Sequence, residues 1–208
     1  MIMDKENNQQ AGDFKSWLEQ SRKALQNDQG MDVPCGSCTA CCKSSYFIHI
    51  RPDEKKTLEH IPKELLFPAP GMPAGQKVLG FNEKGHCPML KNNKCTIYET
   101  RPLTCRSYDC RVFCATGLPP GTKKKALIHE QVERWGFTFS NDSDKQLYNT
   151  VRKTAKFLVE NRKKFPKDFI PSNITQLAVL AIKIYPLFIA KKTSDLELIQ
   201  RIINTVKD

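Results

Sequence analysis

The chain has 208 residues and a formal net charge of +11, with 26% charged and 39% hydrophobic residues. This length and composition predict one sizeable domain, or one domain with an appended helical piece, and they exclude a disordered chain. The longest apolar stretch, 177–190, is too short to span a bilayer, so we expect a buried helix there and no transmembrane segment. The first ten residues lack the apolar region of a signal peptide, and we therefore expect a cytoplasmic, reducing location.

The N-terminal part of the chain predicts a polar arm and one helix. Residues 1–12 are polar, and we expect them to be disordered. From Asp13 to Gln26 the apolar residues recur at helical spacing, which predicts an amphipathic helix. Asp13 has the side chain of an N-cap, and Gly30 is expected to end this part of the chain.

The middle of the chain predicts short elements joined by loops. Residues 46–50 and 78–81 are predicted strands, and residues 53–60 form a predicted short helix that follows a proline. Residues 67–75 contain three prolines and two glycines, which predict a loop. A turn is expected at residues 82–85.

The C-terminal part of the chain predicts helices. Residues 117–121 read GLPPG, which is typical of a linker or a tight turn. Three helices are expected after it, at 143–165, 173–190 and 194–206, and none of them contains a cysteine.

These elements predict an α+β fold that is small and loop-rich. A metal-stabilised cysteine core with short strands is expected to be flanked by N-terminal and C-terminal helices. The predicted domains are a cysteine-cluster domain at 13–114, including the leading helix, and a basic helical region at 115–208 that packs on it.

Nine cysteines are many for a chain of this size in a reducing compartment. Reducing conditions disfavour structural disulfides, so clustered cysteines there indicate metal binding or redox chemistry. The odd number also argues against a fully paired disulfide framework.

The densest cluster holds four cysteines within eight residues: Cys35, Cys38, Cys41 and Cys42. A C-x-x-C turn brings two sulfurs close and leaves backbone amides free to donate to them, which suits both zinc and iron–sulfur sites. A third cysteine at the same spacing can serve a third corner of a [4Fe–4S] cluster. Cys41 and Cys42 are adjacent and point in different directions, so they serve two sites or one of them supports the other.

A second group of cysteines follows at irregular spacing: Cys87, Cys95, Cys105, Cys110 and Cys114. Together the two groups supply ligands for two four-coordinate sites with one cysteine to spare. Three arginines lie close to these cysteines in sequence, and we expect them to neutralise anionic sulfur: Arg101, Arg106 and Arg111.

The motifs in order are CxxCxxCC at 35–42, CPML at 87–90, CTIYE at 95–99 and RPLTCR at 101–106. This combination resembles the bacterial YkgJ-like cysteine-cluster (CxxCxxCC) family over about residues 33–114. Members are described as zinc- or iron-chelating and are often labelled Fe–S-cluster-containing. The resemblance implies metal ligands at Cys35, Cys38, Cys41, Cys42, Cys87, Cys95 and Cys105. It implies a further ligand at Cys110 or Cys114, of which we prefer Cys110.

Three functions are compatible with these features. The first is a protein that holds one or two iron–sulfur clusters or zinc ions, for electron transfer or for support of a protein-modification reaction. The second is a zinc-stabilised module that binds protein or RNA. The third is a metal-dependent protein-modifying enzyme, since flagellin lysine N-methylases share the cysteine pattern. The chain is shorter than those enzymes and lacks a glycine-rich fingerprint for a methyl-donor nucleotide.

The charge is unevenly distributed along the chain. Residues 1–34 carry −2, residues 35–114 carry +5 and residues 115–208 carry +8. Most basic residues are scattered over predicted helical surfaces, and bound thiolates offset part of the positive charge. We therefore expect a protein partner or substrate and do not favour nucleic acid.

Overall fold

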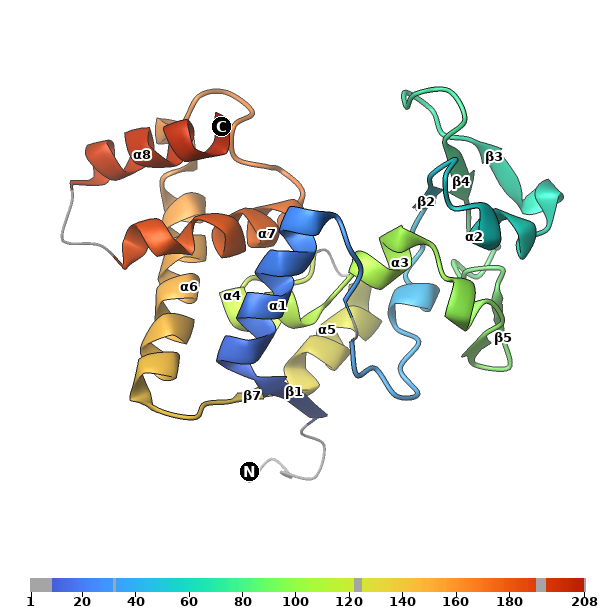
Figure 1. Ribbon diagram of the computed structural model, residues 1–208, viewed down its shortest axis with the longest axis horizontal. Coiled ribbons are helices and arrows are strands. Elements are labelled where there is room, and N and C mark those ends of the chain that lie inside the picture. The colour runs from blue at the N-terminus through green and yellow to red at the C-terminus, as the bar shows by residue number, and fades with distance from the viewer. Residues whose placement is uncertain (1–8, 32, 122–124, 190–193, 208) are drawn as a thin grey trace. The chain divides into compact units, whose positions relative to one another are not determined.

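The computed structural model describes residues 9–31, 33–121, 125–189 and 194–207 (Figure 1). They divide into two compact units. We name Lys23–Asp109 together with Lys123–Gln131 the cysteine unit. The helical unit comprises Met1–Arg22, Cys110–Thr122 and Val132–Asp208. The predicted α+β class is confirmed, because each unit combines helices with short strands.

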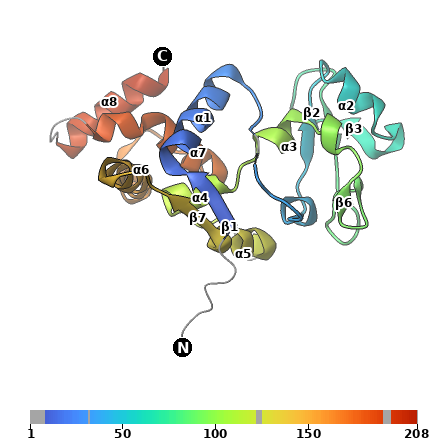
Figure 2. The same ribbon diagram turned by 60° about the horizontal axis from the view of Figure 1, so that its bottom comes forward.

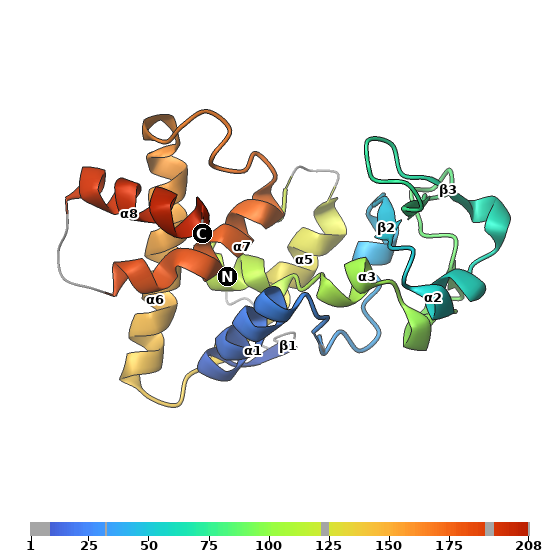
Figure 3. The same cartoon turned by 45° about the horizontal axis from the view of Figure 1, so that its top comes forward.

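The helical unit is built around three helices near the C-terminus: α6 (Asp142–Glu160), α7 (Ile174–Ile184) and α8 (Asp195–Lys207). The helix α6 crosses α7 and α8 in both Figure 1 and Figure 3. Leu158, Leu177 and Ile202 are fully buried where these helices meet. All three helices were predicted, although the first predicted range, 143–165, ends in a 3-10 turn, Arg162–Lys164.

A parallel pair of strands completes the helical unit: β1 (Gln9–Asp13) and β7 (Trp135–Thr138) (Figure 2). Gln9 pairs with Trp135, and Asp13 pairs with Thr138. The predicted disorder of residues 1–12 is therefore wrong for residues 9–12, while residues 1–8 lie outside the described residues. The polar sequence gave no strand signal because β1 is held by a partner more than a hundred residues away, and its Ala11 is fully buried.

The helix α1 (Phe14–Asn27) begins where the sequence predicts. The backbone N–H of Ser16 donates to Asp13 Oδ1 at 2.9 Å, so Asp13 is the N-cap. The buried ring of Phe14 packs edge-on against Phe137 and Tyr148, with centroids 5.2 and 5.1 Å away. These aromatic contacts explain the apolar face that the sequence places on this helix.

The cysteine unit contains a three-stranded antiparallel sheet in the order β2 (Ile48–Ile50), β4 (Lys77–Leu79), β3 (Leu66–Pro68). A second pair, β5 (Leu90–Lys91) and β6 (Lys94–Cys95), forms a hairpin. Two short helices accompany the strands: α2 (Lys55–Glu59) and α3 (Leu103–Ser107). The buried core is small, and it consists of Ile48, Ile50, Ile61, Leu79, Met89 and Ile97.

Several boundaries differ from the predictions. The loop expected from residue 67 starts only after β3, because Phe67 and Pro68 pair with β4. The sequence gave no separate indication of α3, α4 (Arg111–Thr116), α5 (Ala126–Arg134) or β7. Among the described residues, no helix has both the length and the apolar character that a bilayer-spanning segment requires.

The units also divide the chain differently from the predicted domains. Most of the leading helix lies in the helical unit, and the cysteine unit ends at Asp109 instead of residue 114. The segment Lys123–Gln131, which has no cysteine, belongs to the cysteine unit. This division into units cannot be predicted from local sequence patterns, since it arises from contacts between segments far apart in the chain.

Candidate metal centre

The CxxC turn at the start of the cluster is formed by the backbone. The N–H of Cys38 donates to the carbonyl of Cys35 at 2.9 Å. Gly36 lies between them with φ +56°, in the left-handed region that glycine adopts at little cost. Cys35 and Cys38 are both half-buried.

Cys41 and Cys42 lie in a 3-10 turn, η2 (Cys41–Lys43), that is tied to the next cysteine segment. The carbonyl of Cys42 accepts the N–H of Cys87 at 2.7 Å. Three residues after Cys42, the N–H of Ser45 donates to the carbonyl of Gly85 at 2.9 Å. These bonds bring the CC pair and Cys87 together, although 44 residues separate Cys42 from Cys87 in the sequence.

 The sheet β2–β4–β3 lies between the two segments in the chain, so a long-range contact and not local sequence sets their distance.

Cys87 and Cys95 are positioned by the hairpin β5–β6. Leu90 pairs with Cys95, and the N–H of Thr96 donates to the carbonyl of Met89 at 2.9 Å. The hairpin turns at Asn92 and Asn93, which have φ values of +50° and +56°. Asparagine tolerates this conformation, and two such residues are typical of a tight two-residue hairpin turn. The turn therefore sets Cys95 at a fixed register opposite Leu90.

Cys105 lies in α3, and α2 holds the start of that helix. The carboxylate of Glu54 accepts the backbone N–H of Leu103 at 2.5 Å and that of Arg51 at 2.9 Å. Thr57 donates its hydroxyl to the carbonyl of Thr100 at 2.8 Å. The sequence carries no signal for this role of Glu54 at the start of a second helix.

Gly30 and Arg106 connect the segment before the first cysteines to α3. A Cβ atom at Gly30 would overlap the side chain of Arg106, so only glycine fits this approach. The N–H of Met31 donates to the carbonyl of Arg106 at 2.8 Å. The chain thus enters the CxxC turn from a fixed point beside the helix of Cys105.

Five of the thiols form one group, because each affects the ionisation of others: Cys41, Cys42, Cys87, Cys95 and Cys105. A hydrogen bond from Cys42 lowers the pKa of Cys41 to about 7. The same bond, together with burial, raises the pKa of Cys42. Burial and, to a smaller extent, the neighbouring thiols raise the pKa of Cys105 to about 12. Burial also raises the pKa of Cys87.

The adjacent cysteines thus share one surrounding. Cys42 is affected by Cys87 and Cys105, and Cys105 is affected by Cys41. Both alternatives that the sequence left open for this pair, two separate sites or a supporting role for one cysteine, stay predictions.

Of the three arginines that were predicted to neutralise the sulfurs, Arg101 lies beside this group. The guanidinium of Arg101 is 3.5 Å from the centroid of the Tyr98 ring, and its charge lowers the pKa of Cys41 and Cys105. Arg106 supports it by donating to the Arg101 carbonyl at 3.1 Å. The expectation for Arg111 is wrong, because this residue is buried in the helical unit and donates to the carbonyl of Ala11 at 3.0 Å.

Cys110 and Cys114 have different surroundings, since both belong to the helical unit. Cys110 is buried, and its sulfur accepts the indole N–H of Trp135 at 3.1 Å. The thiol of Cys114 donates to the carbonyl of Trp135 at 3.3 Å. The ligand role of Cys110 stays a prediction, and its contact with a buried indole is one that a structural cysteine makes.

The donor set of the cysteine unit suits a thiophilic metal. Thiolates select zinc, copper(I) and iron–sulfur clusters, whereas magnesium and calcium prefer oxygen. Cys87, Cys95 and Cys105 pack against the small apolar core, which limits the access of water to them. Within the described parts of the chain, no three Cys, His, Asp or Glu side chains stand in a ready-made metal-coordinating arrangement. The thiols gather without converging on one point.

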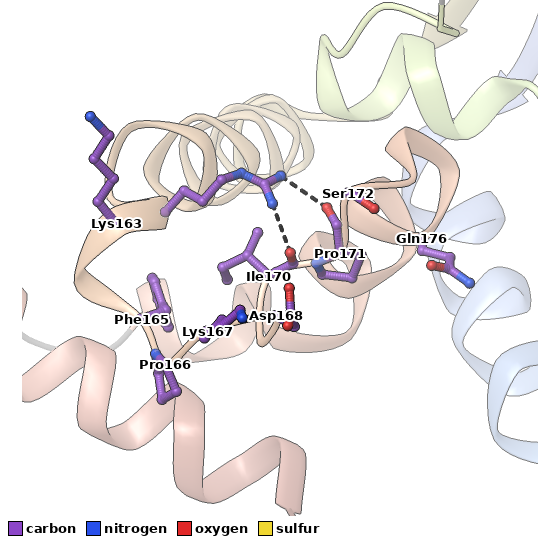
Figure 4. A pocket seen from close by; sticks show the side chains of 10 residues that line it. Lys163, Phe165, Pro166, Lys167, Asp168, Ile170, Pro171, Ser172 and Gln176 are labelled. Carbon is purple, nitrogen blue, oxygen red and sulfur yellow. Dashed lines mark hydrogen bonds between the residues drawn. The ribbon is translucent and has the colours of Figure 1, made fainter.

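The helical unit has an open pocket of about 710 Å³ (Figure 4). Arg162 shapes it by donating to the carbonyl of Ile170 at 2.7 Å and to that of Pro171 at 2.9 Å. Lys163 and Lys167 also line it, and none of its lining residues is a cysteine. The pocket is therefore a separate feature from the thiol group.

Because its thiols gather on a small apolar core, the cysteine unit falls in the class of cysteine-cluster proteins. Residues 34–133 match the family model CxxCxxCC, whose description is "Putative zinc- or iron-chelating domain". This match confirms the resemblance seen in the motifs and supports metal binding by this part of the chain. No curated protein and no solved structure matches the chain.

Proposed function

We propose that the cysteine unit holds an iron–sulfur cluster through cysteine thiolates. The observation that carries this proposal is the single group of five mutually interacting thiols. An iron–sulfur cluster and a tetrahedral zinc site each take four thiolates, and this group supplies them with Cys42 to spare. The CxxC turn adds Cys35 and Cys38 from the preceding segment, at a spacing that recurs in iron–sulfur sites.

The primary ligands in this proposal are four thiols from separate segments: Cys41, Cys87, Cys95 and Cys105. Cys42 donates a hydrogen bond to Cys41 and supports it. The positive charge of Arg101 offsets part of the charge that thiolates bring. When bound, the cluster would supply reversible one-electron transfer, and the chain would set its potential through charge and hydrogen bonds.

We place this activity in the cytoplasm, where reducing conditions keep the thiols available for metal. A protein partner that exchanges electrons, or a protein whose modification needs them, fits the proposal. The strongly basic chain favours an acidic surface on that partner.

The test is anaerobic purification followed by measurement of iron, zinc and acid-labile sulfide and by an absorption spectrum. We expect a brown protein with iron and sulfide in equal amounts. A colourless protein with stoichiometric zinc would overturn the iron–sulfur proposal. It would support instead a zinc-stabilised binding module, which the family description equally allows.

Two matched variants locate the centre. We expect Cys105→Ser to lose the bound metal, because this half-buried thiol belongs to the five-thiol group. We expect Cys114→Ser to keep it, because this thiol lies in the helical unit. Full metal content in Cys105→Ser would show that the group is not the binding site.

A further inference from the structure

One residue outside the cysteine motifs contacts the backbone that carries the CC pair. Lys125 lies in the cysteine-free segment that belongs to the cysteine unit. Its ammonium group donates to the carbonyl of Ser44. The same group lies 3.5 Å from the centroid of the Tyr46 ring, in a cation–π contact.

Ser44 closes the turn of Cys41 and Cys42. Its side chain is buried, and its hydroxyl donates to the carbonyl of Ala40 at 2.7 Å. Its backbone N–H donates to the carbonyl of Cys41 at 3.4 Å. The carbonyl that Lys125 holds therefore belongs to the residue that closes the turn of Cys41 and Cys42.

Tyr46 extends the contact toward the helix of Cys105. Its hydroxyl lies 3.3 Å from that of Tyr108, and the two ring centroids are 5.5 Å apart. Tyr108 directly follows α3 (Leu103–Ser107), which carries Cys105. Lys125 and the tyrosine pair thus connect the segments on both sides of the thiol group.

We propose that Lys125 is a positioning residue of the metal centre, which holds the Cys41–Cys42 turn through the Ser44 carbonyl and the Tyr46 ring. The part of this inference that is measured as metal release rests on the proposed function, because it requires a bound metal. It also explains why the segment 123–131 belongs to the cysteine unit and why the family match extends to residue 133. Lysine suits the position because its ammonium group has three donors and no acceptor.

The test compares Lys125→Met with Lys125→Arg in the full chain. Methionine keeps length and apolar contact but removes every donor, whereas arginine keeps donors and charge. The matched control is Lys153→Met, since Lys153 is exposed on α6. Two rates are measured: release of bound metal to an excess of chelator, and alkylation of Cys41 and Cys42 in the metal-free protein, followed by mass spectrometry.

We expect Lys125→Met to release metal about tenfold faster, the size seen when outer contacts of metal ligands are lost. Alkylation of Cys41 and Cys42 should also accelerate, while that of Cys114 stays unchanged. Lys125→Arg should restore most of both rates, and Lys153→Met should match the wild type. Unchanged rates in Lys125→Met would overturn the inference, and so would equal acceleration at Cys114, which reports general loosening.

The two proposals fail in distinguishable ways. Absence of metal from the wild-type protein overturns the proposed function, and the alkylation rates then decide the role of Lys125 alone. If Lys125→Met does not fold, Tyr46→Leu replaces it by removing the ring under the ammonium group. Tyr46→Leu should accelerate both rates and Tyr46→Phe should not, and equal rates in the two variants would overturn the inference.

Discussion

The two units use cysteine in opposite ways. In the cysteine unit, the half-buried thiol of Cys105 has other thiols as neighbours. In the helical unit, the buried thiol of Cys110 accepts a hydrogen bond from an indole. The same side chain is thus a candidate ligand in one place and a core residue in the other, and its surroundings decide which.

The two units also differ in the size of their hydrophobic cores. The helical unit buries a large cluster between α6, α7 and α8, including Leu158 and Leu177. The core cluster of the cysteine unit has only six buried apolar residues, and the strands of this unit are two or three residues long. A core this small supplies little hydrophobic stabilisation, so units of this kind depend on metals or cross-links. From this comparison we expect that the cysteine unit needs a metal for folding and that the helical unit does not.

Metal removal should give the largest difference between the units. Binding free energy in a small metal-dependent unit is folding free energy. We expect chelation to lower the protection of amides in the cysteine unit by about 3 kcal/mol or more, and that in α6 and α7 by less than about 0.5 kcal/mol. Hydrogen exchange with peptide-level mass spectrometry measures both in one sample. Equal losses in the two units would break the comparison.

A cavity in the helical core should give the next largest effect. Leu158 is fully buried in α6, and truncation of such a residue costs about 2–5 kcal/mol. We expect Leu158→Ala to lower the free energy of unfolding of the helical unit by this amount, measured by urea denaturation. Metal content per chain should not change. The control is Val159→Ala at the next position, which is 46% exposed and should have a small effect.

Cys110 offers a sharper test, because the sequence predicted it as a ligand. Cys110→Ala removes the acceptor of the Trp135 indole N–H, and Trp135 is buried. An unsatisfied buried donor costs about 1–3 kcal/mol. We expect that loss in denaturation experiments, with metal content unchanged and with partial rescue by Cys110→Ser. Loss of metal comparable to that in Cys105→Ser would instead make Cys110 a ligand.

The sequence predicted the features that local chemistry determines. Asp13 caps α1 as expected, and the apolar faces of α6, α7 and α8 were readable from their spacing. The CxxCxxCC motif identified the family, and the structure brings Cys41 and Cys42 together with Cys87 and Cys105. Motifs and helical periodicity can be recognised in a sequence because they depend on residues only a few positions apart.

The features that were missed depend on distant contacts. The strand β1 is polar and forms only because β7 pairs with it. Lys125 contacts a carbonyl 81 positions earlier in the chain, and nothing in the KKK run distinguishes it from its neighbours. Arg111 resembles the other arginines of its motif, but it lies two residues past the end of the cysteine unit. One sequence does not specify such pairings.

The smallest expected effect concerns the pH dependence of the helical unit. Burial raises the pKa of Cys114, although Arg152 and Tyr148 partly oppose this. An unfolded cysteine ionises near about pH 8.5. Because the folded value is higher, the stabilisation is fully present below that pH and is lost as the pH rises through the folded pKa.

We therefore expect wild-type stability to fall relative to Cys114→Ala by roughly 1 kcal/mol between pH 8.5 and 9.5, since one pH unit corresponds to about 1.4 kcal/mol per proton. Urea denaturation at several pH values measures the difference in free energy of unfolding between the wild type and Cys114→Ala. The contributions of the other titrating groups largely cancel in this difference. Tyr148 donates to the Cys114 carbonyl at 3.1 Å, and burial raises its pKa too, so Tyr148→Phe controls for its contribution. A difference that stays constant with pH would mean that Cys114 ionises as freely in the folded unit as in the unfolded chain. The core environment that separates this thiol from those of the cysteine unit would then be absent.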